Sequence, residues 1–417
     1  MKKLIYTSFS PNTRYKDLFL NISILFSPWT WIKGDYSDKI KDVFEDKFSS
    51  SKAFTFNYAR SGMYILFKSL GVSNFQVVVQ GYTCVVAVSP VKGSGAEVVY
   101  ADIDPETGNF GIEDLKKKIT AKTKVILFQY TYGSSSGIED IVEVCRERKL
   151  LLIEDCTNTV FGKHKDKFIG SFGDAAIFSF GRDKAISGVD GGLTLINNKN
   201  LIPNFVKECD KLGYPSVSWV INELVYPIIW SSIKALFNIK VGKLIHFIFT
   251  KFGILTKATS ESEKRGEILE TSICLMPNGL ARLAYNQLKD IDVINDHRKS
   301  IVELYESGLK DIEGIELFKY QEGNVLLRFS LKVDRRDEFV EYMRRSNVYL
   351  GDWYTTPIAP KEVNLDLVGY RRGMCPNSEH VCEKIVNLPT HINLSKQDAE
   401  VIVKLVKTFY ADKENNR

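Results

Sequence analysis

Three residues suited to chemistry stand close together in the middle of the chain, each at or beyond the end of an apolar run. Asp155 follows Leu150-Leu-Leu-Ile-Glu, Ser179 follows Ala175-Ala-Ile-Phe, and Lys184 comes five residues after the serine. A carboxylate can keep a pyridine nitrogen protonated, a hydroxyl can hold a phosphate, and a lysine can form a Schiff base. Together these groups meet the needs of pyridoxal phosphate.

Each residue taken singly also has a structural explanation. An aspartate often ends a strand as a cap or turn residue, a serine often stabilises a turn, and a lysine is usually solvated. The order and spacing of the three favour one shared site over three unrelated roles. We therefore predict a pyridoxal-phosphate site with Lys184 as its catalytic residue.

Such a site needs elements that bring strand ends together. From Val77 onward, short runs rich in Val, Ile and Leu alternate with helix-like stretches such as 112–119 and 138–148. This alternation predicts an α/β fold with a mostly parallel sheet flanked by helices. Ligands of such sheets bind at the carboxyl ends of the strands, where Asp155 and Ser179 are expected.

The 417 residues are enough for two domains. We expect an N-terminal extension over 1–45, a large cofactor-binding domain over 46–290, and a smaller C-terminal α+β domain over 291–417. A helical insertion interrupts the large domain at about 203–264. It is rich in aromatic and basic residues, namely Trp219, Tyr226, Trp230, Phe237, Phe247, Phe249, Phe252, Lys234, Lys240, Lys243 and Lys251.

Composition excludes several classes of protein. The net charge of +5 is spread among acidic residues, which argues against a nucleic-acid partner. Seven cysteines without a CxxC pair favour neither a disulfide framework nor a metal site, so a cytoplasmic protein is expected. The apolar stretches 18–32 and 224–233 are too short to span a membrane, and the N-terminus does not resemble a secretory signal.

At this point the sequence resembles the DegT/DnrJ/EryC1/StrS sugar aminotransferases, which are fold-type I pyridoxal-phosphate enzymes. The resemblance covers most of the chain outside 1–45 and 203–264. It rests on Ser61-Gly62, Asp102-Ile-Asp-Pro-Glu-Thr-Gly, Thr123-Lys-Val-Ile, Glu154-Asp155, Gly173-Asp174, Ser179 to Lys184, Asp190-Gly-Gly, Gln287-Leu288, Arg298 and Leu388-Pro-Thr-His391.

The resemblance implies a role for each matching position. Lys184 would form the Schiff base and move the proton as general acid and base, and Asp155 would pair with the pyridinium. Ser179 would bind the phosphate together with the backbone amides of the helix that opens at Ser61-Gly62-Met63. Asn158 stands where the family usually carries Gln or His near the ring hydroxyl.

Four departures from the family pattern bear on the site. Cys84 replaces the aromatic that often stacks on the cofactor ring, so either Tyr82 stacks instead or the ring face is thinly covered. Residues 273–276, Ile-Cys-Leu-Met, replace a stretch that reaches the phosphate in the neighbouring subunit, and that contact is expected to be lost. Arg182 is either a phosphate ligand or an exposed arginine. Tyr130 stands where many relatives have a His.

The family implies amino transfer from glutamate to a nucleotide-linked 3- or 4-keto sugar in surface polysaccharide biosynthesis, by a homodimer. Lys184 favours transamination, because relatives that eliminate a sugar hydroxyl carry His there. Two alternatives stay open: a lipid-linked or non-sugar carbonyl substrate, and a non-catalytic cofactor-binding relative. The aromatic and basic segments 18–31 and 203–264 either pack on the catalytic domain or make a peripheral membrane contact.

Overall fold

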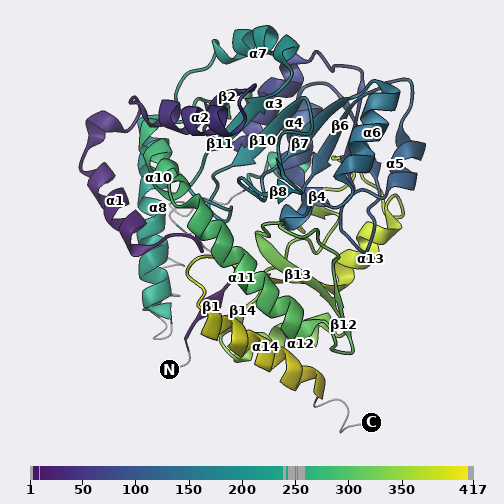
Figure 1. Cartoon of the computed structure of the whole chain (residues 1–417). Coiled ribbons are helices and arrows are strands. Elements are labelled where there is room, and N and C mark those ends of the chain that lie inside the picture. The colour runs from purple at the N-terminus through teal and green to yellow at the C-terminus, as the bar shows by residue number, and fades with distance from the viewer. Residues whose placement is uncertain are drawn as a thin grey trace.

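The computed structural model describes residues 3–8, 10–237, 241, 242, 249, 251 and 259–411. Four of the aromatic and basic residues singled out in the insertion, Lys240, Lys243, Phe247 and Phe252, lie outside the described residues. The chain forms a large region around a seven-stranded sheet and a smaller region around a three-stranded sheet (Figure 1).

The seven-stranded sheet confirms the predicted, mostly parallel arrangement. Its strand order is β2-β11-β10-β7-β6-β3-β5, and β11 alone runs against its neighbours. Central strands are buried on both faces, which explains their continuous apolar runs. The strands are β2 (Lys52–Phe56), β3 (Gln76–Gln80), β5 (Glu97–Ala101), β6 (Thr123–Gln129), β7 (Leu151–Asp155), β10 (Ala175–Ser179) and β11 (Gly192–Ile196).

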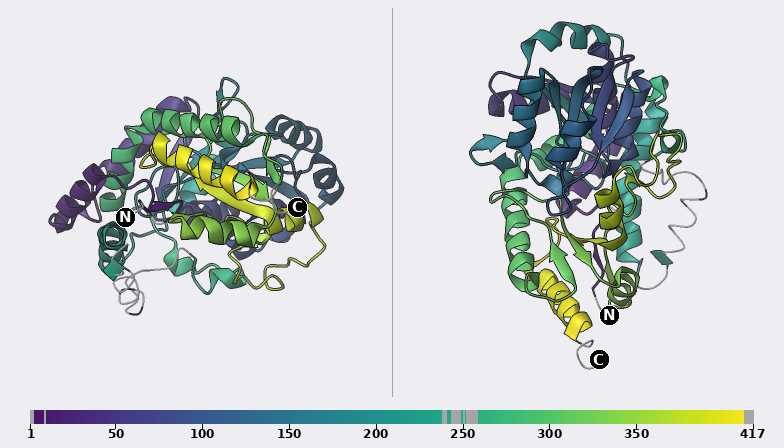
Figure 2. Two further views of the ribbon diagram at one scale, coloured as in Figure 1. Left: turned by 90° about the horizontal axis from the view of Figure 1, so that it is seen from below. Right: turned by 90° about the vertical axis from the view of Figure 1, so that its right-hand side faces the viewer.

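Helices cover both faces of this sheet, as two separate cores show (Figure 2). Leu152 and Ile153 of β7 point into different cores, because side chains alternate along a strand. One core includes α3 (Ala59–Ser69), α4 (Val85–Gly93) and α7 (Ile202–Cys209). The other includes α2 (Tyr36–Lys47), α5 (Ile112–Lys118), α6 (Ile138–Arg148), α8 (Val217–Ala235) and α10 (Asn278–Leu288).

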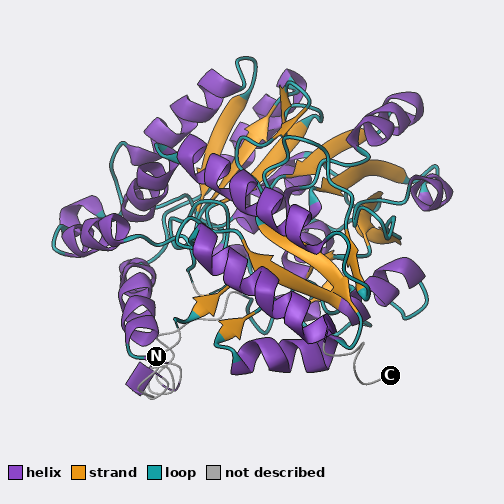
Figure 3. Ribbon diagram, turned by 60° about the horizontal axis from the view of Figure 1, so that its bottom comes forward, coloured by secondary structure: helices purple, strands orange, loops and turns teal. Residues whose placement is uncertain are grey.

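The smaller region has its own core beneath an antiparallel sheet of order β12-β13-β16 (Figure 3). The strands are β12 (Ile315–Leu317), β13 (Arg328–Val333) and β16 (Ile385–Pro389), and the helices are α11 (Ile291–Leu309), α12 (Arg336–Arg345), α13 (Pro376–Lys384) and α14 (Lys396–Ala411). The α+β character agrees with the pattern of this part of the sequence. The boundaries at 45 and 290 stay predictions.

The N-terminal residues pack on both regions. Strand β1 (Ile5–Tyr6) pairs in parallel with β14 (Val348–Tyr349) of the smaller region. Helix α1 (Tyr15–Leu25) lies beside α8, where the Asn21 amide donates to the Leu224 carbonyl at 2.7 Å. Within the described residues, no helix is both long and apolar enough to cross a membrane.

The remaining elements are short. Two-residue strands pair as β4 (Thr83–Cys84) with β15 (Ile358–Ala359) and as β8 (Lys163–His164) with β9 (Lys167–Phe168). Single 3₁₀ turns form η1 (Pro28–Thr30), η2 (Thr131–Gly133), η3 (Lys199–Leu201), η5 (Glu263–Arg265) and η6 (Glu270–Ser272). The β4–β15 pair brings residues near 358 to the carboxyl edge of the large sheet.

Candidate active site

Asp155, Ser179 and Lys184 lie in one cavity at the carboxyl edge of the large sheet. Asp155 ends β7 and Ser179 ends the neighbouring parallel strand β10. A turn follows β10, in which the Lys184 amide donates to the Gly181 carbonyl at 3.2 Å. All three residues line a cavity of about 510 Å³, a volume typical of small-molecule sites. The spacing recognised in the sequence therefore corresponds to a real cluster of side chains.

The Lys184 amine points toward two polar side chains and an indole. Its Nζ atom donates to Asn158 Oδ1 at 3.1 Å and lies 3.5 Å from Thr157 Oγ1. It also lies 4.8 Å from the centre of the Trp353 ring. Burial lowers the pKa of Lys184 from its usual 10.5, and the nearby Asp155 opposes this shift. Burial thus shifts the protonation equilibrium of Lys184 toward the neutral, nucleophilic amine.

Asp155 is the acidic group of the cavity. Its Oδ1 atom accepts the Thr157 amide hydrogen at 3.0 Å, and the residue is 3% exposed. Burial raises the pKa of the Asp155 carboxyl, while Thr157 and the charge of Lys184 oppose the rise. A cationic partner that enters the cavity would favour the ionised form.

Glu154 precedes Asp155 but points to the other face of β7. Its carboxylate accepts amide hydrogens from Gly170 at 2.8 Å, Phe172 at 2.8 Å and Gly173 at 2.7 Å. The Tyr130 hydroxyl donates to the same carboxylate at 2.5 Å, and Tyr130 is fully buried. Tyr130 therefore lies in the core beside Glu154 and does not line the cavity.

The start of α3 contributes a wall beside Ser179. This helix begins at Ala59, and Tyr58, Ala59, Arg60 and Met63 line the cavity. Ser61 is buried, and its hydroxyl donates to Asn57 Oδ1 at 2.8 Å. The Gly62 amide donates to the Tyr58 carbonyl at 3.5 Å. The helix thus begins two residues before Ser61, the first of the residues that the sequence suggested as its opening.

A side chain at position 62 would collide with its surroundings. A Cβ atom there would lie 2.2 Å from Thr194 Oγ1 and 2.8 Å from the Phe56 ring. Gly62 therefore allows α3 to pack closely on β11 and β2. Close packing therefore explains why the Ser61-Gly62 motif has a glycine at this position.

Arg182 lines the cavity but is held by acidic side chains. Its guanidinium donates to Glu223 at 2.7 Å and to Asp190 at 3.4 Å, and it stacks 3.8 Å from the centre of the Tyr226 ring. Burial and the neighbouring Glu223 raise the pKa of Asp190 well above its ordinary value. The exposed-arginine explanation is wrong, because Arg182 is 8% exposed.

The two residues considered for ring stacking have different positions. Cys84 lines the cavity, whereas Tyr82 is fully buried and its hydroxyl lies 2.7 Å from that of Tyr132. The Tyr82 ring packs edge-on against Tyr354. Aromatic side chains that line the cavity come instead from Tyr58, Tyr226, Trp230, Trp353 and Tyr354.

Residues 273–276 pack on their own chain beside the start of α3. The Cys274 amide donates to Asn57 Oδ1 at 3.1 Å, and the Asn57 amide donates to the Cys274 carbonyl at 3.0 Å. Ile273 and Met276 are buried. This stretch therefore braces the residues that precede α3.

Several lining residues were not suggested by the sequence. Thr157 lies inside the motif that contains Asp155, so its proximity was a usable signal. Trp353, Tyr226 and Ser8 come from distant parts of the chain and carry no local signature. Arg328 stacks 3.6 Å from the centre of the Trp353 ring and lies 3.8 Å from Asp183. Only the folded chain brings these groups to Lys184.

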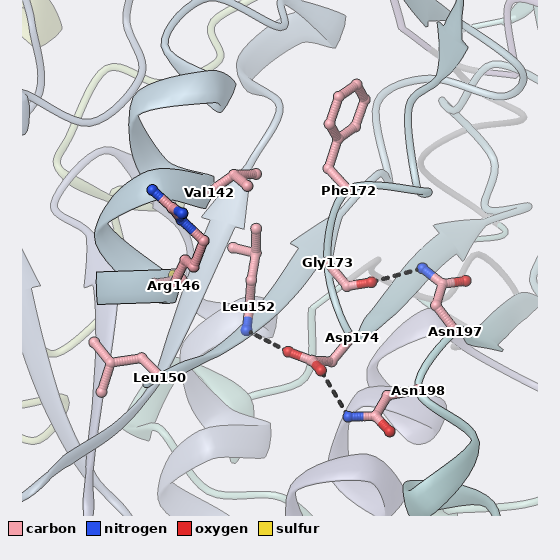
Figure 4. Close-up of a pocket in the computed structure, with 10 residues that line it drawn as sticks. Val142, Arg146, Leu150, Leu152, Phe172, Gly173, Asp174, Asn197 and Asn198 are labelled. Atoms are coloured by element: carbon pink, nitrogen blue, oxygen red, sulfur yellow. Dashed lines mark hydrogen bonds between the residues drawn. The ribbon is translucent and has the colours of Figure 1, made fainter. Parts of the chain in front are cut away.

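A second polar cluster lies at the opposite edge of the same sheet (Figure 4). It borders a cavity of about 360 Å³. Asp174 accepts from the Leu152 amide at 2.9 Å and from the Asn198 side chain at 2.8 Å. Asn197 donates to the carbonyls of Gly170 and Gly173, both at 2.8 Å. Each of these polar groups thus has a hydrogen-bond partner within the cluster or on the main chain. The hydrogen bonds link the segments at the amino ends of β7 and β10. Across the described residues, no cluster of His, Cys, Asp or Glu could hold a metal ion.

The chain belongs to the DegT/DnrJ/EryC1/StrS aminotransferase family, whose model matches residues 21–216 and 245–407. This match confirms the resemblance found in the sequence. It also covers 21–45, 203–216 and 245–264, so the expectation that all of 1–45 and 203–264 lie outside the family pattern was wrong. The match leaves out 217–244, which contains α8 and falls within the predicted insertion. Residues 1–20 also precede the match.

Relatives and solved structures agree with this placement. A GDP-perosamine synthase of Escherichia coli O157:H7 is 34% identical over 42% of this chain and 49% of its own length. The dTDP-4-dehydro-2,3,6-trideoxy-D-glucose 4-aminotransferase of Saccharopolyspora spinosa is 25% identical over 82% of this chain and 81% of its own. The chain thus aligns with about half the length of the first relative and with most of the second.

Among solved structures, an Escherichia coli GDP-4-keto-6-deoxy-D-mannose-3-dehydratase with bound hydrated PLP has a TM-score of 0.74. It is 16% identical, and the match covers 97% of this chain and 99% of that one. This similarity confirms the predicted fold class, an α/β fold-type I architecture.

Proposed function

We propose that the protein is a pyridoxal-phosphate-dependent aminotransferase that moves an amino group from glutamate to a nucleotide-linked keto sugar. The observation that carries this proposal is the shared cavity of Lys184 Nζ, the Asp155 carboxyl and the Ser179 hydroxyl. When bound, pyridoxal phosphate supplies an electron sink that makes the proton on the amino-bearing carbon removable. The protein must then hold the ring, hold the phosphate and move one proton.

Lys184 is the group we assign to covalent attachment and proton movement. Its lowered pKa makes a neutral amine available, and its contacts with Asn158 and Thr157 orient it into the cavity. We assign Asp155 to the pyridine nitrogen, because a protonated ring nitrogen would stabilise its ionised form. Asn158 would face the ring hydroxyl.

The phosphate would lie between Ser179 and the start of α3. Hydroxyl groups and the amides of a helix N-terminus both favour an anion. The family implies this role for Ser61, Gly62 and Met63, of which Met63 lines the cavity, while the Gly62 amide donates to the Tyr58 carbonyl. Arg182 supplies a buried positive charge nearby. Cys84, rather than the buried Tyr82, would contact the ring face.

The acceptor and the assembly follow from the relatives. One relative is named for a GDP-linked amino sugar that it makes, and the other for a dTDP-linked 4-dehydro sugar that it aminates at position 4. The presence of Lys184 favours transamination over sugar dehydration. A homodimer and a role in surface polysaccharide biosynthesis complete the proposal.

The test is an absorbance spectrum of purified protein with pyridoxal phosphate, before and after glutamate, beside Lys184→Ala. We expect a visible band in the wild-type protein that glutamate bleaches, and no such band in the variant. A lysine-dependent band that glutamate and other amino donors leave unchanged would favour the non-catalytic alternative. Absence of any lysine-dependent band would overturn the assignment of the site.

A peripheral membrane contact, with a lipid-linked or other carbonyl acceptor, is the second candidate. Helix α1 and the adjoining η1 expose four aromatic side chains, Tyr15, Phe19, Phe26 and Trp29, which are 72% to 85% exposed. Aromatic side chains with neighbouring lysines, here Lys16, suit the headgroup layer of a bilayer. Helix α1 packs on α8, and both α8 and the part of α1 that carries Tyr15 and Phe19 lie outside the family match.

Vesicle flotation tests this second candidate. Intact protein is expected to float with phosphatidylcholine vesicles that contain phosphatidylglycerol, and Phe19→Ser/Trp29→Ser is expected to remain at the bottom. Phe75→Ser/Leu367→Ser, which removes exposed apolar groups elsewhere, is the matched control. Equal behaviour of the two variants would refute a membrane surface on α1.

A further inference from the structure

A short N-terminal segment, residues 5–8 and 10–13, joins the smaller region to the loop that carries Lys184. We name it the N-terminal strap. On one side it is fixed to the smaller region: the Tyr6 carbonyl lies 2.8 Å from His391 Nε2, and the Pro11 carbonyl accepts from Asn393 at 2.7 Å. The strap precedes residue 21, where the family match begins.

On its other side the strap contacts the loop from 181 to 185. The Ser10 amide donates to Asp183 Oδ1 at 3.0 Å. The Asn12 side-chain amide donates to the Lys184 carbonyl and, at 3.2 Å, to the Ala185 carbonyl. These contacts hold the Asp183 side chain and the main-chain carbonyls of Lys184 and Ala185.

Asn12 is also held from behind by a buried arginine. Its Oδ1 atom accepts from Arg298 Nη2 at 3.0 Å, and Arg298 is 1% exposed. Arg298 in turn donates to the Leu327 carbonyl at 2.9 Å and to Thr390 Oγ1 at 2.8 Å. Asn12 itself is 1% exposed, so each of these hydrogen bonds is shielded from water.

The residue type fits this position closely. An asparagine side chain offers two N–H donors and one carbonyl acceptor, which here meet two carbonyls and one guanidinium. An alanine would leave the guanidinium and both carbonyls without these partners. A change at position 12 therefore acts on the Lys184 main chain and on Arg298 together.

We infer that Asn12 is a positioning residue that fixes the Lys184 main chain from the smaller region, so that the lysine amine stays directed into the cavity. The inference rests on the role proposed for Lys184. Precise placement matters, because a misplacement of about 1 Å can slow a reaction roughly a hundredfold.

The test compares Asn12→Ala with Asn393→Ala. Asn393 donates to the Pro11 carbonyl at 2.7 Å and the Thr13 carbonyl at 3.0 Å, so its variant also removes two bonds to the strap. The two hydrogen bonds that Asn393→Ala removes lie on the side of the strap that faces the smaller region, away from Lys184. Asn12→Ser, which keeps a hydroxyl acceptor for Arg298, replaces Asn12→Ala if the alanine variant does not fold.

The first measurement uses cofactor-free protein and acetic anhydride. The pH dependence of Lys184 acetylation, followed by peptide mass spectrometry, reports the pKa of its amine. In Asn12→Ala the loop relaxes toward water, so the midpoint is expected to rise by about half a unit or more. Asn393→Ala is expected to keep the wild-type midpoint.

The second measurement uses protein loaded with pyridoxal phosphate. We expect Asn12→Ala to slow bleaching by glutamate by about tenfold to a hundredfold, with little change in the glutamate concentration for half-maximal rate. Wild-type midpoint and rate in Asn12→Ala, or equal changes in Asn393→Ala, would overturn the inference. A shifted midpoint without glutamate-dependent bleaching even in the wild type would support the positioning role and refute the proposed function.

Discussion

The two edges of the seven-stranded sheet carry polar clusters of similar make-up but opposite character. At the amino edge, Asp174 and Asn197 bind backbone groups and each other's neighbours with hydrogen bonds of 2.8 to 2.9 Å. At the carboxyl edge, Asp155 and Lys184 border a larger cavity. Burial raises the pKa of Asp155 and lowers the pKa of Lys184 from their usual values. Both clusters contain an aspartate and asparagine.

This difference separates a cluster that stabilises the fold from one that can react. Mutually satisfied polar groups lower the free energy of the folded chain. Groups whose charged form is disfavoured by burial cost stability, and such groups concentrate where chemistry requires them. The mutual satisfaction of hydrogen bonds distinguishes the two edges better than residue type does.

The largest expected effect is the loss of activity in Asp155→Ala. Without the carboxylate, the ring nitrogen of the cofactor loses its partner, and kcat should fall roughly a hundredfold or more. The thermal midpoint of the cofactor-free protein should not fall, because burial already disfavours this carboxylate. Steady-state kinetics with glutamate and a nucleotide-linked keto sugar, beside melting curves, check both expectations. If Asp155→Ala lost stability but kept its kcat, the carboxyl edge would be the structural cluster and not the reactive one.

The opposite result is expected for Asp174→Ala. Its loss leaves the Leu152 amide and the Asn198 side chain without an acceptor, at a cost of about 1–3 kcal/mol in the free energy of unfolding. Urea unfolding measures this cost. At temperatures where the Asp174→Ala variant is folded, its activity should equal that of the wild type. A lower activity under these conditions would indicate that Asp174 has a role in the active site.

Local patterns in the sequence were sufficient for the large sheet and the central trio. Parallel strands buried on both faces leave long apolar runs, and the residues at their ends converge because parallel neighbours end at one edge. Asp155, Ser179 and Lys184 lie within thirty residues of one another, so spacing alone linked them.

Other parts of the site depended on contacts that spacing does not record. Trp353 reaches Lys184 from the smaller region, and Glu223 meets Arg182 from a helix outside the family pattern. The start of α3 was misplaced by two residues, since Gly62 looks like a helix-opening residue but is required for packing on Thr194. Tertiary packing decided each of these features.

A smaller effect is expected on the pH dependence of Lys184. Only the neutral amine attacks pyridoxal phosphate, so the rate of attachment should rise with pH and level off above a midpoint lower than 10.5. The charge of Arg328 contributes to the lowered pKa of Lys184. Arg328→Gln should therefore move the midpoint upward by about half a unit. Stopped-flow absorbance over a pH series measures this shift.

Arg335→Gln is the matched control for this charge effect. Arg335 is partly exposed and paired with Glu338 on α12. Its loss should leave the Lys184 midpoint in place. A lower Lys184 midpoint in Arg328→Gln would mean that repacking around Trp353 affects the pKa of Lys184 more than the removed charge does.

The smallest expected effect concerns the two cysteines that border the two cavities, Cys84 at the carboxyl edge and Cys145 at the amino edge. Burial raises the pKa of both thiols, that of Cys145 to about 12, so both are neutral near pH 7. Cys84 can then offer the cofactor contact but no charge, and Cys84→Ser should weaken pyridoxal-phosphate binding by less than about fivefold. Cofactor should slow alkylation of Cys84 by iodoacetamide and leave that of Cys145 unchanged. Equal protection of both would mean that the cofactor stabilises the whole sheet instead of covering one edge.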